Sequence, residues 1–255
     1  MLSSHSRRLV AAMAVAGINA GPVLAQTFSP PQREEIGRVV KEYLLQNPEV
    51  LQDAMNELQR RSSEAERTAQ TAAIKELREE LKTSAPGTVF GNPAGDVTLV
   101  EFFDYNCPYC KRSLADLQAL LKSDPKLRVV IKDFPVLGAE SLDASRVALA
   151  AKAQLSGDKL LDYHARLLGT RGRVNGERAL AVARELGLDI PRVQKDAAGA
   201  EVRTALDANR RSGERIGING TPAYVIGDEM VAGAVGLEPL REAVTAMRRC
   251  GHAAC

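Results

Sequence analysis

Apolar side chains recur at helical spacing through the first third of the chain. Between residues 31 and 46, one helical face carries Ile36, Val39, Val40, Tyr43 and Leu44. The following Asn47-Pro48-Glu49 supplies a capping residue, a proline for the first helical position and an acid for the positive helix end. No further proline or glycine occurs before Lys82, which predicts a second helix of roughly 34 residues, or ~50 Å.

The second predicted helix carries an apolar seam that it cannot bury alone. Its members are Leu51, Met55, Leu58, Ala65, Ala69, Ala72, Ile74, Leu77 and Leu81. The early spacings alternate between four and three, as in a coiled coil, and the register shifts near Ala72. The seam can pack against the chain's own globular domain or against other copies. The coiled-coil spacing favours other copies, so residues 26–87 are predicted to form an N-terminal helical oligomerisation segment.

The rest of the chain alternates between strand and helix patterns. Glycines and prolines from Thr83 to Gly95 predict a linker, and residues 88–255 form one predicted domain. Expected strands cover residues 97–103, 128–134, 223–226 and 230–231, and expected helices cover 107–121, most of 140–212, and 237–248. The predicted fold class is α/β, with the order β-α-β, a helical block of ~70 residues, and β-β-α.

The first 25 residues have the features of a cleaved secretory signal. Arg7 and Arg8 precede a short apolar stretch, and Val23-Leu24-Ala25 places small residues where a signal peptidase cleaves. Without residues 1–25 the chain holds 32 basic and 32 acidic residues, so its net charge is zero. A neutral chain gives no reason to expect nucleic acid or an anionic membrane as partner. A secreted location also allows disulfides to persist.

Two cysteines, Cys107 and Cys110, stand three residues apart after the first expected strand. As a structural staple they would close a loop of about four residues and stabilise the fold by only ~2 kcal/mol. As a zinc site they lack the usual second pair, because the remaining cysteines, Cys250 and Cys255, lie at the far end of the chain. A redox-active pair is the interpretation that the spacing, the compartment and the preceding strand favour.

The expected helix start assigns different roles to the two thiols. Cys107 would lie at the helix N-terminus, where unpaired N–H groups and the helix dipole stabilise a thiolate. Pro108 suits the first helical position, and Lys111 and Arg112 add positive charge. We therefore expect Cys107 to be the attacking, solvent-facing sulfur with a lowered pKa, and Cys110 to be the resolving thiol.

Glu101 interrupts the first expected strand, which is otherwise apolar. It is an exposed acid if the strand lies at a sheet edge. If the strand is central, Glu101 is buried, its pKa rises, and it can relay a proton to or from Cys110. Lys132 in the next expected strand is then its plausible ionic partner.

The segments VEFFDYNCPYCKR, VVIKDFPVLG and GINGTPAYVIG together resemble the thioredoxin-fold disulfide oxidoreductases of the DsbA type, and within them the ScsC/Com1-like branch. The resemblance implies a thioredoxin-like fold with a helical insert at about residues 138–215. It also implies that Thr221-Pro222 is a cis-proline loop that offers backbone groups to a bound substrate beside Pro108 and Tyr109. Glu101 and Lys132 match the buried acid and its lysine, and the N-terminal helices match a segment that trimerises some members.

Two features depart from the DsbA pattern. Tyr109 stands where strongly oxidising members have histidine, and because it cannot carry positive charge we expect a less depressed Cys107 pKa and a less oxidising centre. The tail from Cys250 to Cys255 is the second departure. A small terminal disulfide is favoured there over a second redox pair or a soft-metal site with His252.

These observations predict a periplasmic protein disulfide isomerase or reductase that needs no cofactor. Its expected partners are cysteine-containing secreted proteins, a membrane redox partner that recycles the cysteine pair, and further copies of the chain, with a trimer favoured. The alternatives are a DsbA-like dithiol oxidase, a non-enzymatic holdase or copper-handling protein, and a cytosolic glutaredoxin. The signal segment and the helical block count against the glutaredoxin.

Overall fold

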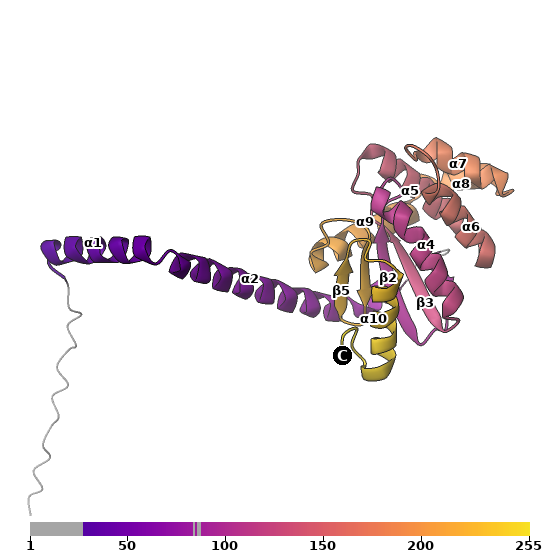
Figure 1. The fold of residues 1–255 in the computed structure, drawn as a ribbon. Coiled ribbons are helices and arrows are strands. Elements are labelled where there is room, and N and C mark those ends of the chain that lie inside the picture. Colours follow the sequence, from indigo (N-terminus) through magenta and orange to yellow (C-terminus); the bar gives the residue numbers. More distant parts are fainter. Residues whose placement is uncertain (1–27, 84, 86–87) are drawn as a thin grey trace, which may run out of the picture. The chain divides into compact units, whose positions relative to one another are not determined.

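The computed structural model describes residues 28–83, 85 and 88–255, so the expected signal segment 1–25 lies outside the described residues. The chain divides into two compact units, one ending at Leu58 and the other running from Gln59 to Cys255 (Figure 1). The division falls within a helix, so the boundary expected near residue 87 does not coincide with it.

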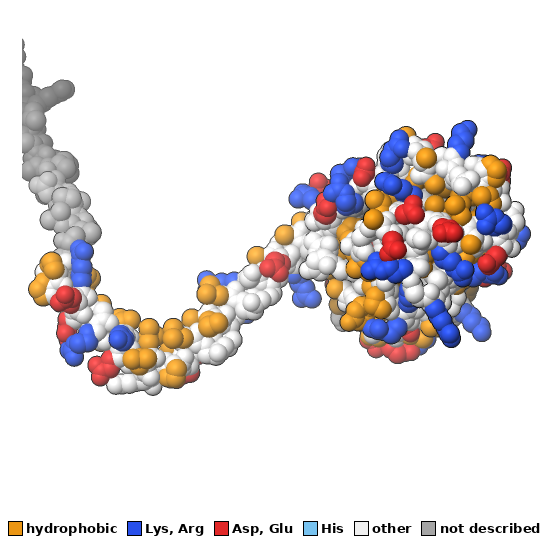
Figure 2. Space-filling view, turned by 90° about the horizontal axis from the view of Figure 1, so that it is seen from above, with side chains coloured by type: hydrophobic (Ala, Val, Ile, Leu, Met, Phe, Trp, Pro, Cys, Tyr) orange, Lys and Arg blue, Asp and Glu red, His pale blue; other side chains and the backbone are white. Residues whose placement is uncertain are grey.

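The first unit contains helix α1 (Pro30–Gln46) and the beginning of α2 (Glu49–Glu76). The Gln32 side chain accepts a 2.9 Å hydrogen bond from the Ser29 N–H at the start of α1, and Asn47-Pro48 separates the two helices as expected. Large apolar side chains remain exposed on both helices, and Figure 2 shows hydrophobic side chains gathered along this unit. They are Ile36, Val39, Val40, Tyr43, Leu51, Met55 and Leu58, each between 43% and 67% exposed.

The end of α2 behaves differently from its beginning. Ile74 is 1% exposed, and Leu81 of the short helix α3 (Arg78–Lys82) is 2% exposed. Both belong to a core cluster of the second unit. The predicted continuous helix to Lys82 is therefore interrupted at Leu77, and the last part of its seam packs against its own domain. For the earlier part of the seam, oligomerisation stays a prediction.

The second unit is built on a five-stranded sheet with the order β1-β3-β2-β4-β5. Its strands are β1 (Val89–Gly91), β2 (Val97–Phe103), β3 (Leu127–Asp133), β4 (Ala223–Ile226) and β5 (Glu229–Ala232). β2 and β3 run parallel, and the other neighbours are antiparallel. The predicted strand at residues 97–103 is therefore the central one, which places Glu101 inside the molecule rather than at an edge.

Strand β1 lies in the stretch that was expected to be only a linker, so that expectation is wrong for residues 89–91. It is a three-residue edge strand that pairs with β3. The glycines around it have a packing reason. A side chain at Gly91 or Gly95 would place its Cβ only 2.5 Å from a backbone oxygen of Leu127 or Lys126, respectively. Close approach of two backbones and a flexible linker therefore give the same sequence signal.

Helices cover both faces of the sheet. The face that carries Leu99, Ile131 and Ile226 packs against α4 (Pro108–Ser123) and α10 (Leu237–Cys250), which lie beside each other in Figure 1. The opposite face carries Val100, Phe102, Val130 and Val225 and packs against the end of α2, α3 and the end of α9.

The helical block is inserted between β3 and β4, as predicted. It comprises α5 (Ala139–Lys152), α6 (Gly157–Leu168), α7 (Gly176–Glu185), α8 (Ile190–Ala197) and α9 (Ala200–Ile216). A fully buried ion pair joins it to the sheet, with Lys152 Nζ 2.5 Å from Asp133 Oδ2. The predicted α/β fold with a helical insertion is confirmed.

Candidate functional site

The cysteine pair lies where the central strand β2 passes into α4. Cys107 is the N-cap residue with extended backbone angles, Pro108 occupies the first helical turn, and Cys110 is one turn further along. Cys110 is 1% exposed, as expected for a resolving thiol. Cys107 is only 4% exposed, so the expectation of a solvent-facing sulfur is wrong in this reduced state. The exposed residue of the motif is Tyr109, at 53%.

A loop from the far end of the sequence covers Cys107. The Thr221-Pro222 peptide bond is cis and directly precedes β4, which runs antiparallel to β2 and therefore begins beside the end of β2, where the cysteines lie. The Cys107 thiol donates a hydrogen bond to the Thr221 carbonyl oxygen, with 3.0 Å between sulfur and oxygen. The structure therefore brings Thr221 and Pro222 to the cysteines, 114 residues away in sequence.

The surroundings of Cys107 stabilise its thiolate. The largest effect on the pKa of Cys107 is the hydrogen bond from the Cys110 thiol. The Thr221 side chain and the backbone N–H groups of Cys110 and Tyr109 also donate to the thiolate. Together these donors outweigh the effect of burial and lower the pKa of Cys107 to about 5. The two backbone donors are free N–H groups of a helix start. Lys111 and Arg112 do not contribute as expected. The Lys111 ammonium binds carbonyl oxygens of Thr170 and Gly172, and the Arg112 guanidinium lies 4.3 Å from the centre of the Tyr109 ring.

Cys110 has the opposite character. Its hydrogen bond to Cys107 and its burial raise its pKa well above the usual thiol range, and the nearby Glu101 carboxylate adds to the rise. At neutral pH the pair thus holds one thiolate and one thiol. This is the arrangement expected for an attacking and a resolving cysteine.

Glu101 is 3% exposed in the middle of β2. Burial raises its pKa to about 8, and the neighbouring Tyr224 hydroxyl opposes the rise as a prospective hydrogen-bond donor. A carboxyl group with this pKa can gain and lose a proton near neutral pH. The structure thus places Glu101 where it can influence Cys110.

The expected ion pair between Glu101 and Lys132 is wrong. In the parallel pairing of β2 with β3, Glu101 is opposite Ile131, whereas Lys132 is opposite Phe102. Since successive side chains of a strand point to opposite faces, Glu101 and Lys132 lie on different sides of the sheet. Lys132 Nζ donates instead to the carbonyl oxygens of Glu80 and Thr83 at the end of α3, at 3.1 and 2.7 Å. Burial lowers the pKa of Lys132 to about 8.

A groove of about 570 Å³ opens beside the cysteines. It is lined by Tyr109, Arg112, Ser113 and Asp116 of α4, by the loop from Asn219 to Pro222, and by Ala232–Ala234 after β5. The groove thus unites two predicted substrate-contact segments, the Pro-Tyr dipeptide and the cis-proline loop. Its polar residues Ser113 and Asp116 were not predicted, because only the helical spacing after Cys110 could have indicated them.

Sequence reasoning also missed the residues that hold the cysteine loop in place. The Asp104 carboxylate accepts hydrogen bonds from the backbone N–H groups of Asn106, Val136 and Leu137, at 2.8 to 3.0 Å. The Asn106 side chain exchanges two hydrogen bonds with the backbone of Val174 in the helical insert. Asp and Asn just before a helix start are the available sequence signal, but it predicts local turns rather than these distant partners.

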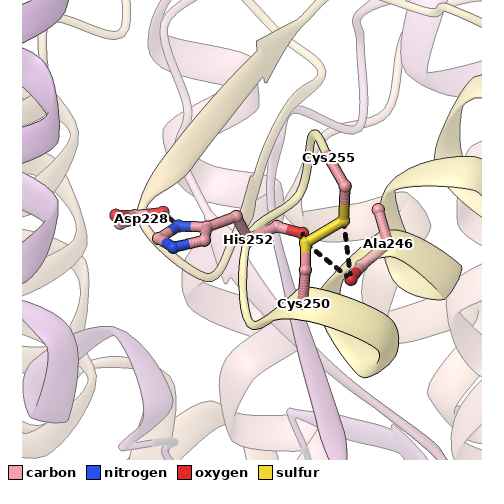
Figure 3. Close-up of a disulfide and its surroundings, with 5 residues drawn as sticks. All are labelled: Asp228, Ala246, Cys250, His252 and Cys255. Atoms are coloured by element: carbon pink, nitrogen blue, oxygen red, sulfur yellow. Dashed lines mark hydrogen bonds and ion pairs between the residues drawn. A yellow bond between two sulfur atoms is a disulfide. The ribbon is translucent and has the colours of Figure 1, made fainter.

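The tail cysteines Cys250 and Cys255 form a disulfide at the end of α10, shown in Figure 3. Both sulfur atoms lie near the Ala246 carbonyl oxygen, at 3.3 and 3.4 Å. His252, inside the disulfide loop, points to Asp228 in the β4–β5 turn, with 3.7 Å between Nδ1 and Oδ1. The favoured interpretation, a small terminal disulfide, is confirmed, and among the described residues no cluster suited to a metal ion occurs.

Comparisons with known proteins agree with this geometry. Residues 98–245 match the family described as DSBA-like thioredoxin domain, and residues 32–65 match the copper resistance protein ScsC N-terminal domain. A thioredoxin-like oxidoreductase from Silicibacter pomeroyi DSS-3 is 41% identical, with 68% of this chain and 98% of that chain covered and a TM-score of 0.63. The thiol-disulfide exchange protein α-DsbA2 from Wolbachia pipientis is 26% identical, with coverages of 72% and 98% and a TM-score of 0.65. A linker-deletion mutant of Proteus mirabilis ScsC is 27% identical, with coverages of 88% and 99% and a TM-score of 0.65.

Among curated proteins, the chain is 29% identical over 160 residues to Na(+)/H(+) antiporter NhaA 1 of Salinispora arenicola. The match covers 62% of this chain but only 24% of that protein, so the chain spans about a quarter of the length of the curated relatives it matches. No helix in the described part of this chain is long and apolar enough to cross a membrane. Because the match to residues 98–245 covers more than half of the chain and includes both central cysteines and the cis-proline loop, this chain belongs to the family of DSBA-like thioredoxin domains, with an ScsC-type N-terminal domain before it.

Proposed function

We propose that this chain is a periplasmic thiol–disulfide oxidoreductase that acts chiefly as a disulfide isomerase or reductase on cysteine-containing secreted proteins. The observation that carries the proposal is the contrast between two thiols one helical turn apart. The pKa of Cys107 is lowered to about 5, whereas that of Cys110 is raised. Cys107 is therefore a nucleophile at neutral pH, while Cys110 keeps its proton until it is needed.

The exchange proceeds through a mixed disulfide. The Cys107 thiolate attacks one sulfur of a client disulfide, and the other client sulfur leaves as a thiolate. In isomerisation, a client thiolate then attacks the mixed disulfide and releases Cys107 unchanged. In reduction, Cys110 loses its proton and attacks Cys107, which releases the second client thiolate and leaves a Cys107–Cys110 disulfide. A membrane redox partner would reduce that disulfide again.

The groove beside the cysteines is the proposed client site. Tyr109 lines one side, with the exposed Pro108 next to it in sequence, and Thr221 and Pro222 line the other. The Cys107 sulfur lies against the Thr221 carbonyl, to which its thiol form donates, and an extended client segment that bound this carbonyl would displace the sulfur and uncover it. This accounts for a nucleophile that is buried in the free protein.

The N-terminal helices are the proposed oligomerisation segment. Their exposed apolar side chains recur with coiled-coil spacing from Leu51 to Leu58, and a second and third copy of the chain would cover them. A trimer would present three cysteine pairs to one client. The periplasmic location rests on the signal-like residues 1–25 and on likeness to a protein described as periplasmic, from Salmonella enterica serovar Typhimurium.

A second candidate function is dithiol oxidation. The strongly lowered pKa of Cys107 favours it, because stabilising the thiolate stabilises the reduced pair and makes the disulfide form a better oxidant. The two candidates use the same residues and differ in the direction of electron flow.

Refolding of ribonuclease by the chain without residues 1–25 tests the proposal. We expect the reduced protein to restore activity to scrambled ribonuclease and Cys107→Ala to abolish this, while Cys110→Ala accumulates mixed disulfides. Faster oxidation of reduced ribonuclease than repair of the scrambled form would identify an oxidase. Equal repair by Cys107→Ala and the unchanged protein would refute thiol chemistry and favour a non-enzymatic holdase.

A further inference from the structure

Glu101 is buried, so a proton that it takes from Cys110 needs a route to solvent in every cycle. We propose that the Tyr224 hydroxyl is this route and relays protons between Glu101 and the groove beside the cis-proline loop. The inference rests on the proposed function and adds a residue to it. Tyr224 acts through Glu101 rather than on the sulfur atoms themselves.

The sheet places the two groups together. Tyr224 of β4 is directly opposite Glu101 of β2 in the antiparallel pairing, so their side chains lie on the same face, the one covered by α4. Tyr224 is 0% exposed. Its hydroxyl and Glu101 Oε2 are both fully buried, and within the described part of the chain neither atom meets the geometry of a hydrogen bond, although the hydroxyl is close enough to the carboxyl group to oppose the rise of its pKa. Buried polar atoms are nearly always hydrogen-bonded, so two such atoms on directly opposed side chains call for an explanation, and a proton path between them supplies one.

The route ends at α4. Ser113 and Asp116 follow Cys110 at helical spacings of three and six residues, and both line the groove with Thr221 and Pro222. The groups whose charge or hydrogen bonding acts on the Tyr224 hydroxyl are Glu101 from β2, and Cys110, Ser113 and Asp116 from α4. The charges of Glu101, Cys110 and Asp116 add to burial in raising the pKa of Tyr224, and Ser113 opposes them as a donor. Tyr224 therefore stays neutral and can pass a proton only by accepting one and donating its own.

The proton balance is complete for the step in which Cys110 resolves a mixed disulfide. Glu101 carboxylate takes the proton of Cys110, and the freed sulfur electron pair forms the bond to Cys107 while the client leaves as a thiolate. Glu101 then returns its proton to the Tyr224 oxygen, as the original hydroxyl proton moves through Ser113 to Asp116 or to solvent in the groove. One proton has moved from Cys110 to the groove, and Glu101 and Tyr224 are restored.

The Tyr224→Phe variant of the chain without residues 1–25 tests the relay, since phenylalanine keeps the ring and removes only the hydroxyl. Cys107 is loaded with glutathione as a mixed disulfide, and release of glutathione by Cys110 is followed from pH 5 to 9. We expect release to slow roughly tenfold near pH 7, a modest share of what general acid–base catalysis contributes. The slowing should disappear at high pH, where hydroxide removes the proton directly, and the pKa of Cys107 should not change.

Three comparisons separate a relay from a structural effect. Tyr163→Phe removes another buried hydroxyl, which donates to the Ala179 carbonyl inside the insert, and should leave release unchanged. Ser113→Ala should slow release as Tyr224→Phe does. A Glu101→Gln, Tyr224→Phe double variant should be no slower than Glu101→Gln alone, because both residues serve one path.

The outcomes distinguish the relay from the proposed function. Normal release by Tyr224→Phe at every pH overturns the relay and leaves the cysteine chemistry intact. Effects of Glu101→Gln and Tyr224→Phe that multiply in the double variant also overturn it, because they place the two residues on separate paths. Failure of the unchanged protein to release glutathione refutes the proposed function itself.

Discussion

Glu101 and Lys132 occupy neighbouring strands of one sheet and point to opposite faces of it. Glu101 faces the α4 side with Cys110, whereas Lys132 binds the carbonyl oxygens of Glu80 and Thr83 on the other side. The two residues therefore have separable roles, one at the cysteines and one in holding α3 against the sheet.

Replacing Lys132 with alanine should destabilise the fold without changing the thiol chemistry. Two hydrogen bonds from a charged donor to backbone carbonyls are lost, so we expect the free energy of unfolding to fall by about 2 kcal/mol. Urea denaturation measures this, and thiolate absorbance at 240 nm measures the pKa of Cys107, which should not move. A shift in the pKa of Cys107 would mean that Lys132 acts on the cysteine pair after all.

Replacing Glu101 with glutamine should make stability less dependent on pH. The folded-state pKa of Glu101 is about 8, above its value of about 4.3 in an unfolded chain. The folded state therefore binds more protons between these values, and stability falls as pH rises from about 4.3 to 8. Glutamine removes this loss, so above pH 8 the variant should gain on the order of 5 kcal/mol relative to the unchanged protein, and at pH 4 it should gain little. Parallel stability curves for the two proteins would contradict a raised Glu101 pKa.

Replacing Tyr109 with histidine should make the cysteine pair more oxidising. Tyr109 is exposed beside Cys107 and carries no positive charge, whereas a protonated histidine would stabilise the thiolate. We expect the pKa of Cys107 to fall by up to about one unit, and the redox potential to rise by about 30 mV. Equilibration with glutathione buffers measures the potential. Tyr109→Phe is the matched control, and an equal shift in both variants would mean that charge is not the cause.

Lysine at both Met55 and Leu58 should dissociate the proposed oligomer. These side chains are 64% and 67% exposed in the single chain and lie on the coiled-coil seam. Light scattering should show a multiple of the chain mass for the unchanged protein and a single chain for the double variant. Gln52→Lys adds a charge beside the seam and should leave the assembly intact. A monomeric unchanged protein would refute the oligomer.

Deletion of residues 26–82 is a poorer test of the oligomer than these substitutions, because it removes Ile74 and Leu81 from the core.

The tail disulfide should stay oxidised while the central pair is reduced. It lies at the C-terminal end of α10, where the helix dipole does not stabilise thiolates, whereas Cys107 lies at a helix N-terminus. Stepwise reduction followed by thiol labelling and mass spectrometry should modify Cys107 and Cys110 first. Replacing Cys250 and Cys255 with serine should cost about 2 kcal/mol of stability and leave ribonuclease refolding unchanged. A loss of refolding activity would indicate a second redox pair instead.

Much of the fold could be predicted because its signals are local. Strand β4 and the central strand β2 have the predicted bounds, since apolar runs and flanking glycines are visible in sequence. Strand β1 was missed because three residues carry too little pattern, and Gly91 and Gly95 serve backbone packing rather than a flexible linker. In the site, Cys107, Cys110, Thr221 and Pro222 were found by motif, whereas Tyr224 was given no role although it lies in the segment GINGTPAYVIG, and Asp116 lies in no motif.

The sequence by itself determined which cysteine attacks and which resolves. The strand before Cys107 and the proline after it place the Cys107 sulfur at the helix N-terminus. It also determined where the helical block is inserted. Only the tertiary structure decided which charged groups meet, since strand register sends Glu101 and Lys132 to opposite faces. It likewise decided that Thr221 covers Cys107 and that Tyr224 faces Glu101. The last two contacts join residues more than 100 positions apart in the sequence. They depend on the register in which β2 pairs with β4, and no local sequence pattern specifies that register.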